Sequence, residues 1–128
     1  MRRLLLDSHT LIWFFENDLR LSPSSKVLVE DTGNEVFVSI ASFWEIVIKK
    51  SLSKLTLKKS VGEMLSECAN QQIEILSISQ QDIEVVETLP FHHRDPFDRI
   101  IVAASITRNL EVVSIDNQFD AYPMSRIW

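Results

Sequence analysis

Short runs of apolar residues alternate along the chain with longer segments in which apolar residues recur every three or four positions. The short runs have the length of buried parallel strands, which are covered on both faces and therefore show little polar alternation. They lie at Arg3–Leu6, Glu35–Ser39, residues 73–78 and residues 110–115, and residues 125–128 form a candidate edge strand.

The longer segments are predicted helices. They span residues 8–17, 22–31, 40–52, 60–71, 79–89 and 96–110, with a short helix at 117–122. Ser22 is a good N-cap, because Pro23 follows it at the first helical position. Ser60 and Glu63 match a capping box, and Asn109 suits a left-handed C-cap. Strands that alternate with helices predict a parallel α/β sandwich.

The composition favours one folded domain and excludes several classes of protein. The 128 residues, 45% of them apolar, are expected to form a single domain, 1–128. With only Gly33 and Gly62, the chain lacks the glycine-rich phosphate loops of NTPases and of dinucleotide-binding folds. A net charge of −5 does not suit a generally basic nucleic-acid binder.

Cysteine use and hydropathy indicate a cytoplasmic protein that makes no membrane contact. Cys68 is the only cysteine, which excludes an internal disulfide and a thiolate metal site. No apolar run approaches the roughly 20 residues of a membrane span. The first residues resemble a signal peptide, but Asp7 and His9 interrupt the apolar stretch and no small-residue cleavage site follows.

Four acidic residues from distant parts of the chain fall near the carboxyl ends of predicted strands. Asp7 ends the first strand, and Asp116 directly follows the strand near residue 115. Glu45 lies about one and a half turns into the helix after the second strand, and Asp98 lies in the first turn of helix 96–110. Because ligands bind beyond the carboxyl ends of parallel strands, these four side chains are expected to share one rim.

Some of these acids also have a purely structural explanation. Asp95 is the best N-cap candidate for the last long helix, because Pro96 follows it. Asp98 would then stabilise the helix dipole from the first turn. Asp116 equally suits the start of a turn.

Two of the acids are harder to explain locally. Glu45 forms a capping-box pattern with Ser42, but Ser39 is the better cap, which leaves Glu45 inside the helix among apolar neighbours. A glutamate in such surroundings needs a partner. Asp7 follows an apolar strand that is predicted to be central, where a structural aspartate is uncommon.

Together the four acids point to a bound cation. Carboxylates within about 7 Å of one another repel by roughly 2 kcal/mol per pair at an effective dielectric near 20, on the order of 10 kcal/mol for the set. That repulsion rivals the whole stability of a domain of this size, so the cluster must be protonated or hold a cation. An all-oxygen site without cysteine or a clearly placed histidine suits Mg²⁺ or Mn²⁺.

Four motifs carry a resemblance to a known family: LLLDSHTLIWFF, VSIASFWEIVIKK, HHRDPFDRIIVAAS and VVSIDNQFDAY. With them the chain resembles PIN-domain proteins, and more narrowly the VapC-type toxins of bacterial toxin–antitoxin pairs, from Leu4 to Trp128. The D-P-F-D-R and S-x-W-E-I stretches are the most specific. The resemblance implies a three-layer α/β/α sandwich around a parallel sheet of about four to five strands. It also implies metal-dependent endoribonuclease activity, a homodimer and inhibition by a small antitoxin.

The resemblance assigns the acidic roles to Asp7, Glu45, Asp98 and Asp116. Asp7 and Asp98 are expected to bind Mg²⁺ or Mn²⁺ directly. Glu45 and Asp116 would bind a second ion, bind through water, or help to deprotonate the attacking water. The expected reaction is hydrolysis of an RNA phosphodiester, which leaves 5′-phosphate and 3′-hydroxyl ends in this family.

Four neighbouring side chains are expected to support these ligands: Ser8, Asp95, Ser114 and Asp120. Ser8, next to Asp7, would add a hydroxyl or a water bridge, and Ser114 would orient a carboxylate. Asp95 is expected to cap its helix and also to support the metal ligands from a neighbouring position. Asp120 lies one helical turn beyond Asp116 and could share or replace its role, so both stay open as the fourth acid.

Basic residues near these motifs are candidate RNA contacts. Arg94 and Arg99 flank the D-P-F-D motif, and Lys49 and Lys50 follow Glu45 on its helix. Phosphate contacts of this kind would make RNA affinity depend on salt. The lysines equally suit an ordinary solvated helix face.

Two adjacent histidines and two tryptophans are expected to take no part in the chemistry of the site. His92 and His93 are adjacent in a loop and lack a third ligand at a suitable spacing, so they are assigned no metal role. Trp13 and Trp44 are expected to pack in the core.

Two other functions compete with the nuclease. An aspartyl-phosphate enzyme with Asp7 as nucleophile would need a second aspartate two residues on, where the chain has His9. The other is a non-catalytic RNA-binding or metal-binding regulatory module of the same fold. Such a module has no need of four clustered acids, and metal-dependent RNA cleavage separates it from the enzyme.

Overall fold

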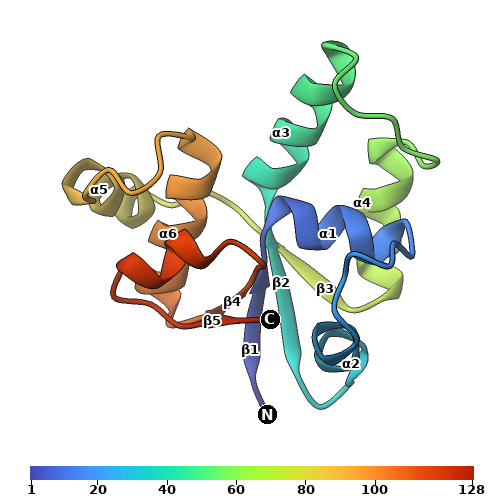
Figure 1. Ribbon diagram of the computed structural model, residues 1–128, viewed down its shortest axis with the longest axis horizontal. Helices are drawn as coiled ribbons and strands as arrows, with labels where there is room; N and C mark the ends of the chain where they lie inside the picture. The colour runs from blue at the N-terminus through green and yellow to red at the C-terminus, as the bar shows by residue number, and fades with distance from the viewer.

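A computed structural model describes the whole chain, residues 1–128 (Figure 1). The elements, in chain order, are β1 (Arg3–Leu6), α1 (Ser8–Phe15), α2 (Pro23–Glu30), β2 (Glu35–Ser39), α3 (Ile40–Ser51), α4 (Val61–Asn70), β3 (Ile73–Leu76), α5 (Gln80–Thr88), α6 (Pro96–Arg108), β4 (Glu111–Val113), the 3₁₀ helix η1 (Asn117–Ala121) and β5 (Arg126–Ile127).

All strands belong to one parallel sheet with the order β3-β2-β1-β4-β5. The central strand is β1, whose last residue, Leu6, pairs with Val38 of β2 on one side and with Val113 of β4 on the other. The carboxyl ends of these three strands therefore lie side by side. The residues that follow them along the chain meet at one edge of the sheet.

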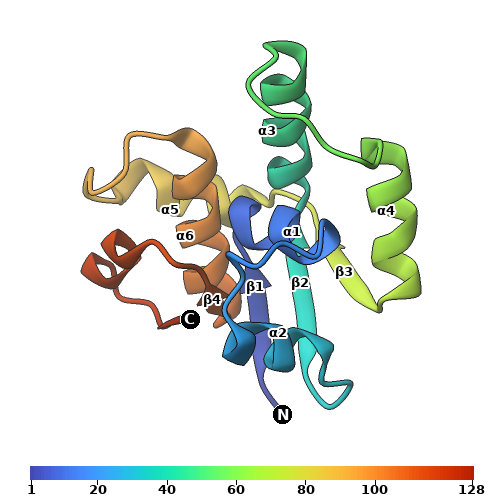
Figure 2. The ribbon, with the colours of Figure 1, turned by 45° about the vertical axis from the view of Figure 1, so that its right-hand side comes forward.

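Alternate side chains of the sheet enter two separate cores. Leu4 and Leu6 pack with apolar residues of α1, α2, α3 and α4 on one face. Leu5 packs with residues of α6 and with Phe119 of η1 on the other face. Figures 1 and 2 show α5 and α6 on one side of the sheet and α1, α2 and α4 on the other. The predicted three-layer α/β/α sandwich with a parallel central sheet is confirmed.

Local signals fix where several helices begin and end. Ser22 and Ser39 cap α2 and α3 as predicted, and the capping box of Ser60 and Glu63 begins α4. Asn109 ends α6 in the left-handed region, with φ 54°. The serine caps supply acceptors for helix-end N–H groups that have no partner within the helix, and the Asn109 N–H donates to the Ser105 carbonyl at the end of α6.

The predicted bounds differ from the structure mainly at strand ends. The strand expected over residues 73–78 ends at Leu76, because its only neighbour, β2, ends at the paired residue Ser39. The strand expected over residues 110–115 is reduced to Glu111–Val113. The candidate edge strand at the end of the chain is present as β5.

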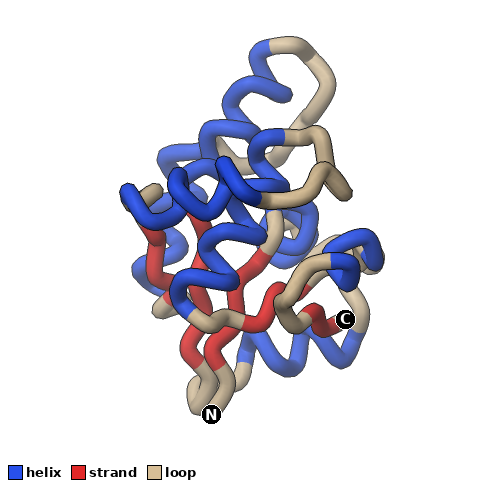
Figure 3. Tube along the Cα trace, turned by 90° about the vertical axis from the view of Figure 1, so that its left-hand side faces the viewer, coloured by secondary structure: helices blue, strands red, loops and turns tan.

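Helix α3 projects beyond the carboxyl edge of the sheet (Figures 1 and 2). Figure 3 shows the N-terminus at one end of the strands, with helices gathered over the other end. Because α3 extends past the sheet, the sheet does not cover all of it, and the core position predicted for Trp44 is wrong: its ring contacts Phe97 of α6 edge-on, but the residue is 61% exposed. Trp13 is buried as predicted. None of the helices combines the length and the apolar character needed to cross a bilayer.

Candidate metal centre

Asp7 is fixed by both of its carboxylate oxygens. It caps α1 by accepting a hydrogen bond from the Thr10 N–H at Oδ1, 2.8 Å away. The Ser114 hydroxyl donates to Oδ2 at 2.5 Å, because the register of β1 with β4 sets the residues after the two strands side by side. The Thr10 hydroxyl also donates to the Val113 carbonyl. Asp7 is therefore buried in one orientation at the centre of the carboxyl edge.

Asp116 reaches the same edge through Ser114. Its backbone N–H donates to the Ser114 hydroxyl oxygen at 3.0 Å, so one buried hydroxyl connects Asp7 with Asp116. The Asp116 carboxylate caps η1 by accepting from the Gln118 N–H at Oδ1, 2.9 Å away. Ser114 thus lies between Asp7 and Asp116 and forms a hydrogen bond with each of them.

Glu45 lies in the second turn of α3 and is buried, with 5% of the residue exposed. The Ser8 hydroxyl donates to Oε1 at 2.6 Å, and the Lys49 ammonium pairs with Oε2 at 2.8 Å. These are the partners that a glutamate among apolar neighbours requires. Because Ser8 directly follows Asp7, the first of these bonds ties Glu45 to the start of α1.

Asp98 lies in the first turn of α6, which Asp95 caps as predicted. Its carboxylate is half-buried and accepts no hydrogen bond from the chain. Burial, followed by the charge of Asp95, raises the pKa of Asp98 to about 7. The charges of Glu45 and Asp7 raise this pKa further, and His93 acts in the opposite direction. The Asp98 carboxylate thus has no hydrogen-bond partner in the chain, and the negative charges of its acidic neighbours help to raise its pKa.

The structure therefore brings the four predicted acids, Asp7, Glu45, Asp98 and Asp116, to one edge of the sheet. The donor atoms of His93, Asp98 and Asp116 lie within 4.8 Å of one another, a spacing that one ion can span. Hard divalent cations prefer oxygen donors, and a cation would offset both the burial and the neighbouring charges that raise the pKa of Asp98. The residues present thus fit Mg²⁺ or Mn²⁺.

His93 is the residue of this centre that the sequence does not reveal. It is buried, and its Nε2 lies 2.7 Å from Oδ2 of Asp116. Its Nδ1 lies 3.1 Å from the Tyr122 hydroxyl, and its ring stacks on Phe119. His93 and Tyr122 are far apart in sequence and neither continues a strand, so spacing gives no signal for their meeting.

Asp120 lies outside this cluster. Its carboxylate is exposed and makes two hydrogen bonds with the Arg126 guanidinium, at 2.9 and 3.0 Å. Those bonds lower the pKa of Asp120 below its ordinary value. Of the two candidates for the fourth acid, only Asp116 belongs to the group with Asp98 and His93.

The basic residues expected near the site occupy different environments. Arg99 is buried, and its guanidinium donates to four backbone carbonyls between residues 86 and 93, at 2.9 to 3.4 Å. It holds the end of α5 and the following loop, a position that does not suit the RNA contact predicted for it. Arg94 is exposed, Lys49 is paired with Glu45, and Lys50 is partly exposed.

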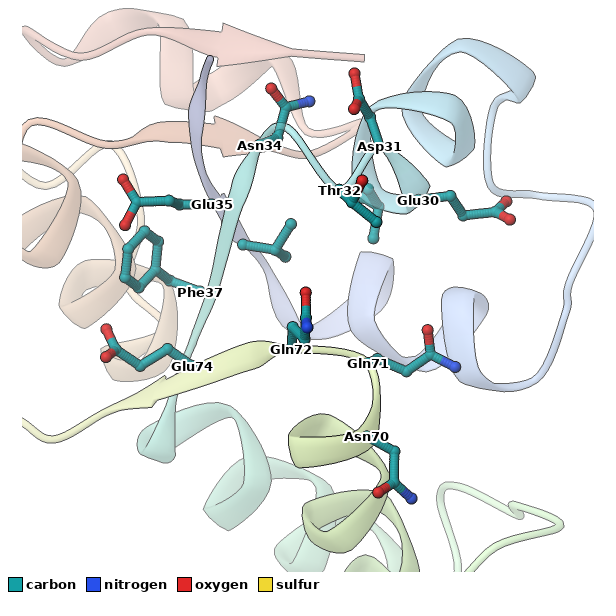
Figure 4. A pocket seen from close by; sticks show the side chains of 12 residues that line it. Glu30, Asp31, Thr32, Asn34, Glu35, Phe37, Asn70, Gln71, Gln72 and Glu74 are labelled. Atoms are coloured by element: carbon teal, nitrogen blue, oxygen red, sulfur yellow. The ribbon is translucent and has the colours of Figure 1, made fainter.

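The largest cavity of the molecule lies at the opposite edge of the sheet, at the amino ends of β2 and β3 (Figure 4). It has a volume of about 600 Å³ and a largely polar lining. In Figure 4, Glu35, Phe37 and Glu74 lie along one side, and Asn70 and Gln71 come from the end of α4. None of the residues of the acidic cluster lines this cavity.

Comparisons with known proteins agree with this architecture. A family model described as the PIN domain matches residues 4–123. A search of curated proteins finds no match. VapBC2 from Rickettsia felis, bound to a DNA fragment from its promoter, is similar in structure with a TM-score of 0.68 and 15% identity over 98% of this chain and 97% of that one. A toxin–antitoxin complex from Klebsiella pneumoniae has a TM-score of 0.58 and 20% identity over 98% and 96%. FitAcB from Neisseria gonorrhoeae has a TM-score of 0.60 and 19% identity over 98% and 96%.

Proposed function

Because the chain belongs to the PIN-domain family, we propose that it is a metal-dependent endoribonuclease and the toxin of a VapC-type toxin–antitoxin pair, acting in the cytoplasm. The proposed nuclease activity rests on one observation: four carboxylates from four separate segments converge at the carboxyl edge of the sheet. Their mutual repulsion is relieved when a divalent cation binds among them.

Asp7 and Asp98 are the proposed direct ligands. Asp7 is held by hydrogen bonds to both oxygens, so its orientation is set before any ion binds. Asp98 has no hydrogen-bond partner to displace. The set of donors is dominated by carboxylate oxygens, which suits Mg²⁺ or Mn²⁺ better than a softer metal.

A bound Mg²⁺ or Mn²⁺ would lower the pKa of a coordinated water and offset charge on the scissile RNA phosphate. Glu45 and Asp116 still have free lone pairs on their carboxylate oxygens. They are the groups that would accept a proton from the attacking water or hold a second ion. The Lys49 ammonium, 2.8 Å from Oε2 of Glu45, holds that carboxylate in one orientation.

RNA would approach this edge along its exposed cations. Arg94 precedes the first turn of α6 and takes part in none of the ion pairs of the structure, so its charge is available to a phosphate. Lys50 lies on α3 one residue beyond Lys49. With a chain of net charge −5, such local cations supply the attraction that the molecule as a whole does not.

Solved structures of similar fold support the proposal that this chain is a toxin. The neighbours from Klebsiella pneumoniae and Rickettsia felis were both solved as toxin–antitoxin assemblies or VapBC pairs. The proposed partner of this chain is therefore a small antitoxin that blocks the acidic edge. Co-expression with the product of the neighbouring reading frame is expected to abolish RNA cleavage by the purified complex.

A homodimer is the proposed state in solution. Ile40, Trp44 and Val47 form an exposed apolar stripe on one side of α3, 40%, 61% and 43% exposed. Residues at this spacing share one face of a helix, and an exposed apolar stripe marks an interface. Light scattering is expected to give twice the 14.8 kDa of one chain, and Trp44→Glu is expected to give the mass of a monomer. A monomeric wild-type protein would contradict the dimer.

The decisive test of activity uses the purified chain with labelled RNA. Cleavage is expected with Mg²⁺ or Mn²⁺, is expected to stop with EDTA, and should be lost in Asp7→Asn. Asp120→Asn makes the same chemical change outside the cluster and is the matched control, which should retain cleavage. RNA binding without cleavage under every metal would instead favour the non-catalytic module.

A further inference from the structure

His93 joins Asp116 to Tyr122 through a continuous line of hydrogen bonds. Its Nε2 lies 2.7 Å from Oδ2 of Asp116, and its Nδ1 lies 3.1 Å from the Tyr122 hydroxyl. The backbone N–H of His93 donates to the same hydroxyl at 2.9 Å. One phenolic oxygen therefore contacts both the backbone and the ring of His93, which fixes the direction of the ring.

The contact with Asp116 indicates which ring nitrogen carries a proton. A carboxylate oxygen accepts hydrogen bonds, so Nε2 is the donor to Oδ2 of Asp116. The Tyr122 hydroxyl, which accepts the backbone N–H of His93, can donate its own proton to Nδ1. The N–H on Nε2 points at Oδ2 of Asp116, and a distance of 2.7 Å is that of a charge-assisted hydrogen bond.

The packing around His93 holds the imidazole in place. The residue is 5% exposed, and its ring stacks on Phe119 at 4.6 Å and on Tyr122 at 5.6 Å between ring centroids. Its carbonyl accepts from the buried Arg99 guanidinium at 3.4 Å. Backbone and ring are thus held on both sides, so the imidazole is a rigid support.

Asp116 needs such a support. It lies between β4 and η1, and its side chain is 35% exposed. Only the Gln118 N–H holds Oδ1, and the bond from His93 is the only one to Oδ2. Without that bond the carboxylate could rotate away from Asp98 into solvent.

We propose that His93, with Tyr122 behind it, is a positioning residue that orients the Asp116 carboxylate toward the metal centre without itself binding the ion. This inference rests on the proposed function. The N–H on Nε2 leaves no lone pair there for a metal, although the atom lies within 4.8 Å of its acidic neighbours. A hydrogen bond of this kind to a metal-binding carboxylate increases metal affinity.

The first test measures Mn²⁺ binding by calorimetry in the absence of RNA. His93→Leu removes the donor and is expected to weaken Mn²⁺ affinity roughly 10- to 100-fold. His93→Gln places an amide N–H near the position of Nε2 and should bind Mn²⁺ nearly as tightly as the wild type. In an Asp116→Ala background, His93→Leu should cause no further loss, because the carboxylate through which it acts is gone.

A second measurement distinguishes a positioning residue from a ligand. Pulsed electron paramagnetic resonance of the Mn²⁺-loaded wild-type protein is expected to show no strong coupling to an imidazole nitrogen. Strong nitrogen coupling that disappears in His93→Gln would make His93 a ligand and overturn the proposal. Unchanged Mn²⁺ affinity in folded His93→Leu would also overturn it.

Folding of the variants is checked by circular dichroism, because His93 is buried. If His93→Leu does not fold, Tyr122→Phe replaces it, since this variant keeps the ring and removes only the hydroxyl. It is expected to weaken Mn²⁺ binding, and unchanged affinity would overturn the proposal. A wild-type chain that shows these effects but cleaves no RNA would refute the ribonuclease and leave the positioning pair standing. A chain that binds no Mn²⁺ would refute both.

Discussion

Replacing Asp98 by asparagine should stabilise the metal-free protein above neutral pH. Burial, and then the charge of Asp95, raise the pKa of Asp98 to about 7, and Glu45 and Asp7 add to the effect. A group with a raised pKa in the folded state binds its proton more tightly there than in the unfolded chain. The stability of the wild type therefore falls as the pH rises from about 4 to about 7. Asparagine has the same shape and no charge to lose.

The size of the gain follows from that pKa. Each pKa unit is worth about 1.4 kcal/mol, so the rise from 3.8 to about 7 corresponds to roughly 4 kcal/mol. Asp98 is only half-buried, and solvent screening reduces this figure to about 1–2 kcal/mol. For a chain of this length the gain raises the melting temperature by roughly 3 to 8 °C.

The assay is thermal unfolding in EDTA at pH 8 and at pH 4.5. Asp98→Asn should melt above the wild type at pH 8, and the difference should shrink at pH 4.5. With Mn²⁺ at pH 8 the order should reverse, because the ion stabilises only a protein that can bind it. Asp31→Asn, an exposed acid at the other edge of the sheet, is the matched control and should melt like the wild type.

One outcome would contradict the raised pKa of Asp98 directly. If Asp98→Asn were no more stable than the wild type in EDTA at pH 8, neither burial nor the neighbouring carboxylates would destabilise the ionised Asp98 side chain. The electrostatic case for a cation at this edge would then be lost. A gain of equal size at pH 4.5 would point to a packing effect of the amide instead.

Three further variants test other parts of the site. Ser114→Ala removes the hydroxyl that joins Asp7 to Asp116; RNA cleavage should fall roughly 10- to 100-fold, while urea unfolding shows a loss of only about 1–2 kcal/mol. Arg99→Met removes the guanidinium donor from the carbonyls of Leu89, Pro90 and His93 and should lower the free energy of unfolding by about 3 kcal/mol or more; unchanged stability would mean that Arg99 is not structural. Arg94→Ala should leave stability unchanged but weaken RNA binding, with the slope of log affinity against log salt smaller by about 0.7 to 0.9; a slope equal to that of the wild type would remove Arg94 from the RNA contacts.

The parts of the fold that follow from local chemistry were predictable from the sequence. The apolar run of β1 requires burial on both faces, and Ser39, Ser22 and Asn109 mark helix ends through their own side chains or backbone. In a parallel sheet the residue after each strand must lie at the carboxyl edge. Asp7 could therefore be placed there without knowledge of any tertiary contact.

The direction of individual side chains was less predictable, because it depends on what packs against them. Arg99 is next to Asp98 in sequence, but a step of one residue turns the side chain by about 100° around the helix. It therefore faces the carbonyls that follow α5 instead of the site. Trp44 has the large apolar side chain that is typical of a core residue, yet α3 extends beyond the sheet that would have covered it.

The role of His93, a loop residue, was equally hard to predict from the sequence. Its meeting with Asp116 depends on the loop before α6 and on η1 lying side by side, and on Tyr122 fixing the ring. None of these arrangements leaves a periodic pattern in the sequence. The absence of a third ligand at regular spacing was therefore a poor guide to the role of this histidine.

Anomalous diffraction from a crystal soaked in Mn²⁺ would show whether the acidic cluster binds an ion. We expect a strong anomalous peak at the carboxyl edge of the sheet, within coordination distance of Asp7 and Asp98, that is absent from crystals of Asp98→Asn. A map without a peak there, or with a peak only at other carboxylates, would contradict the proposed metal site.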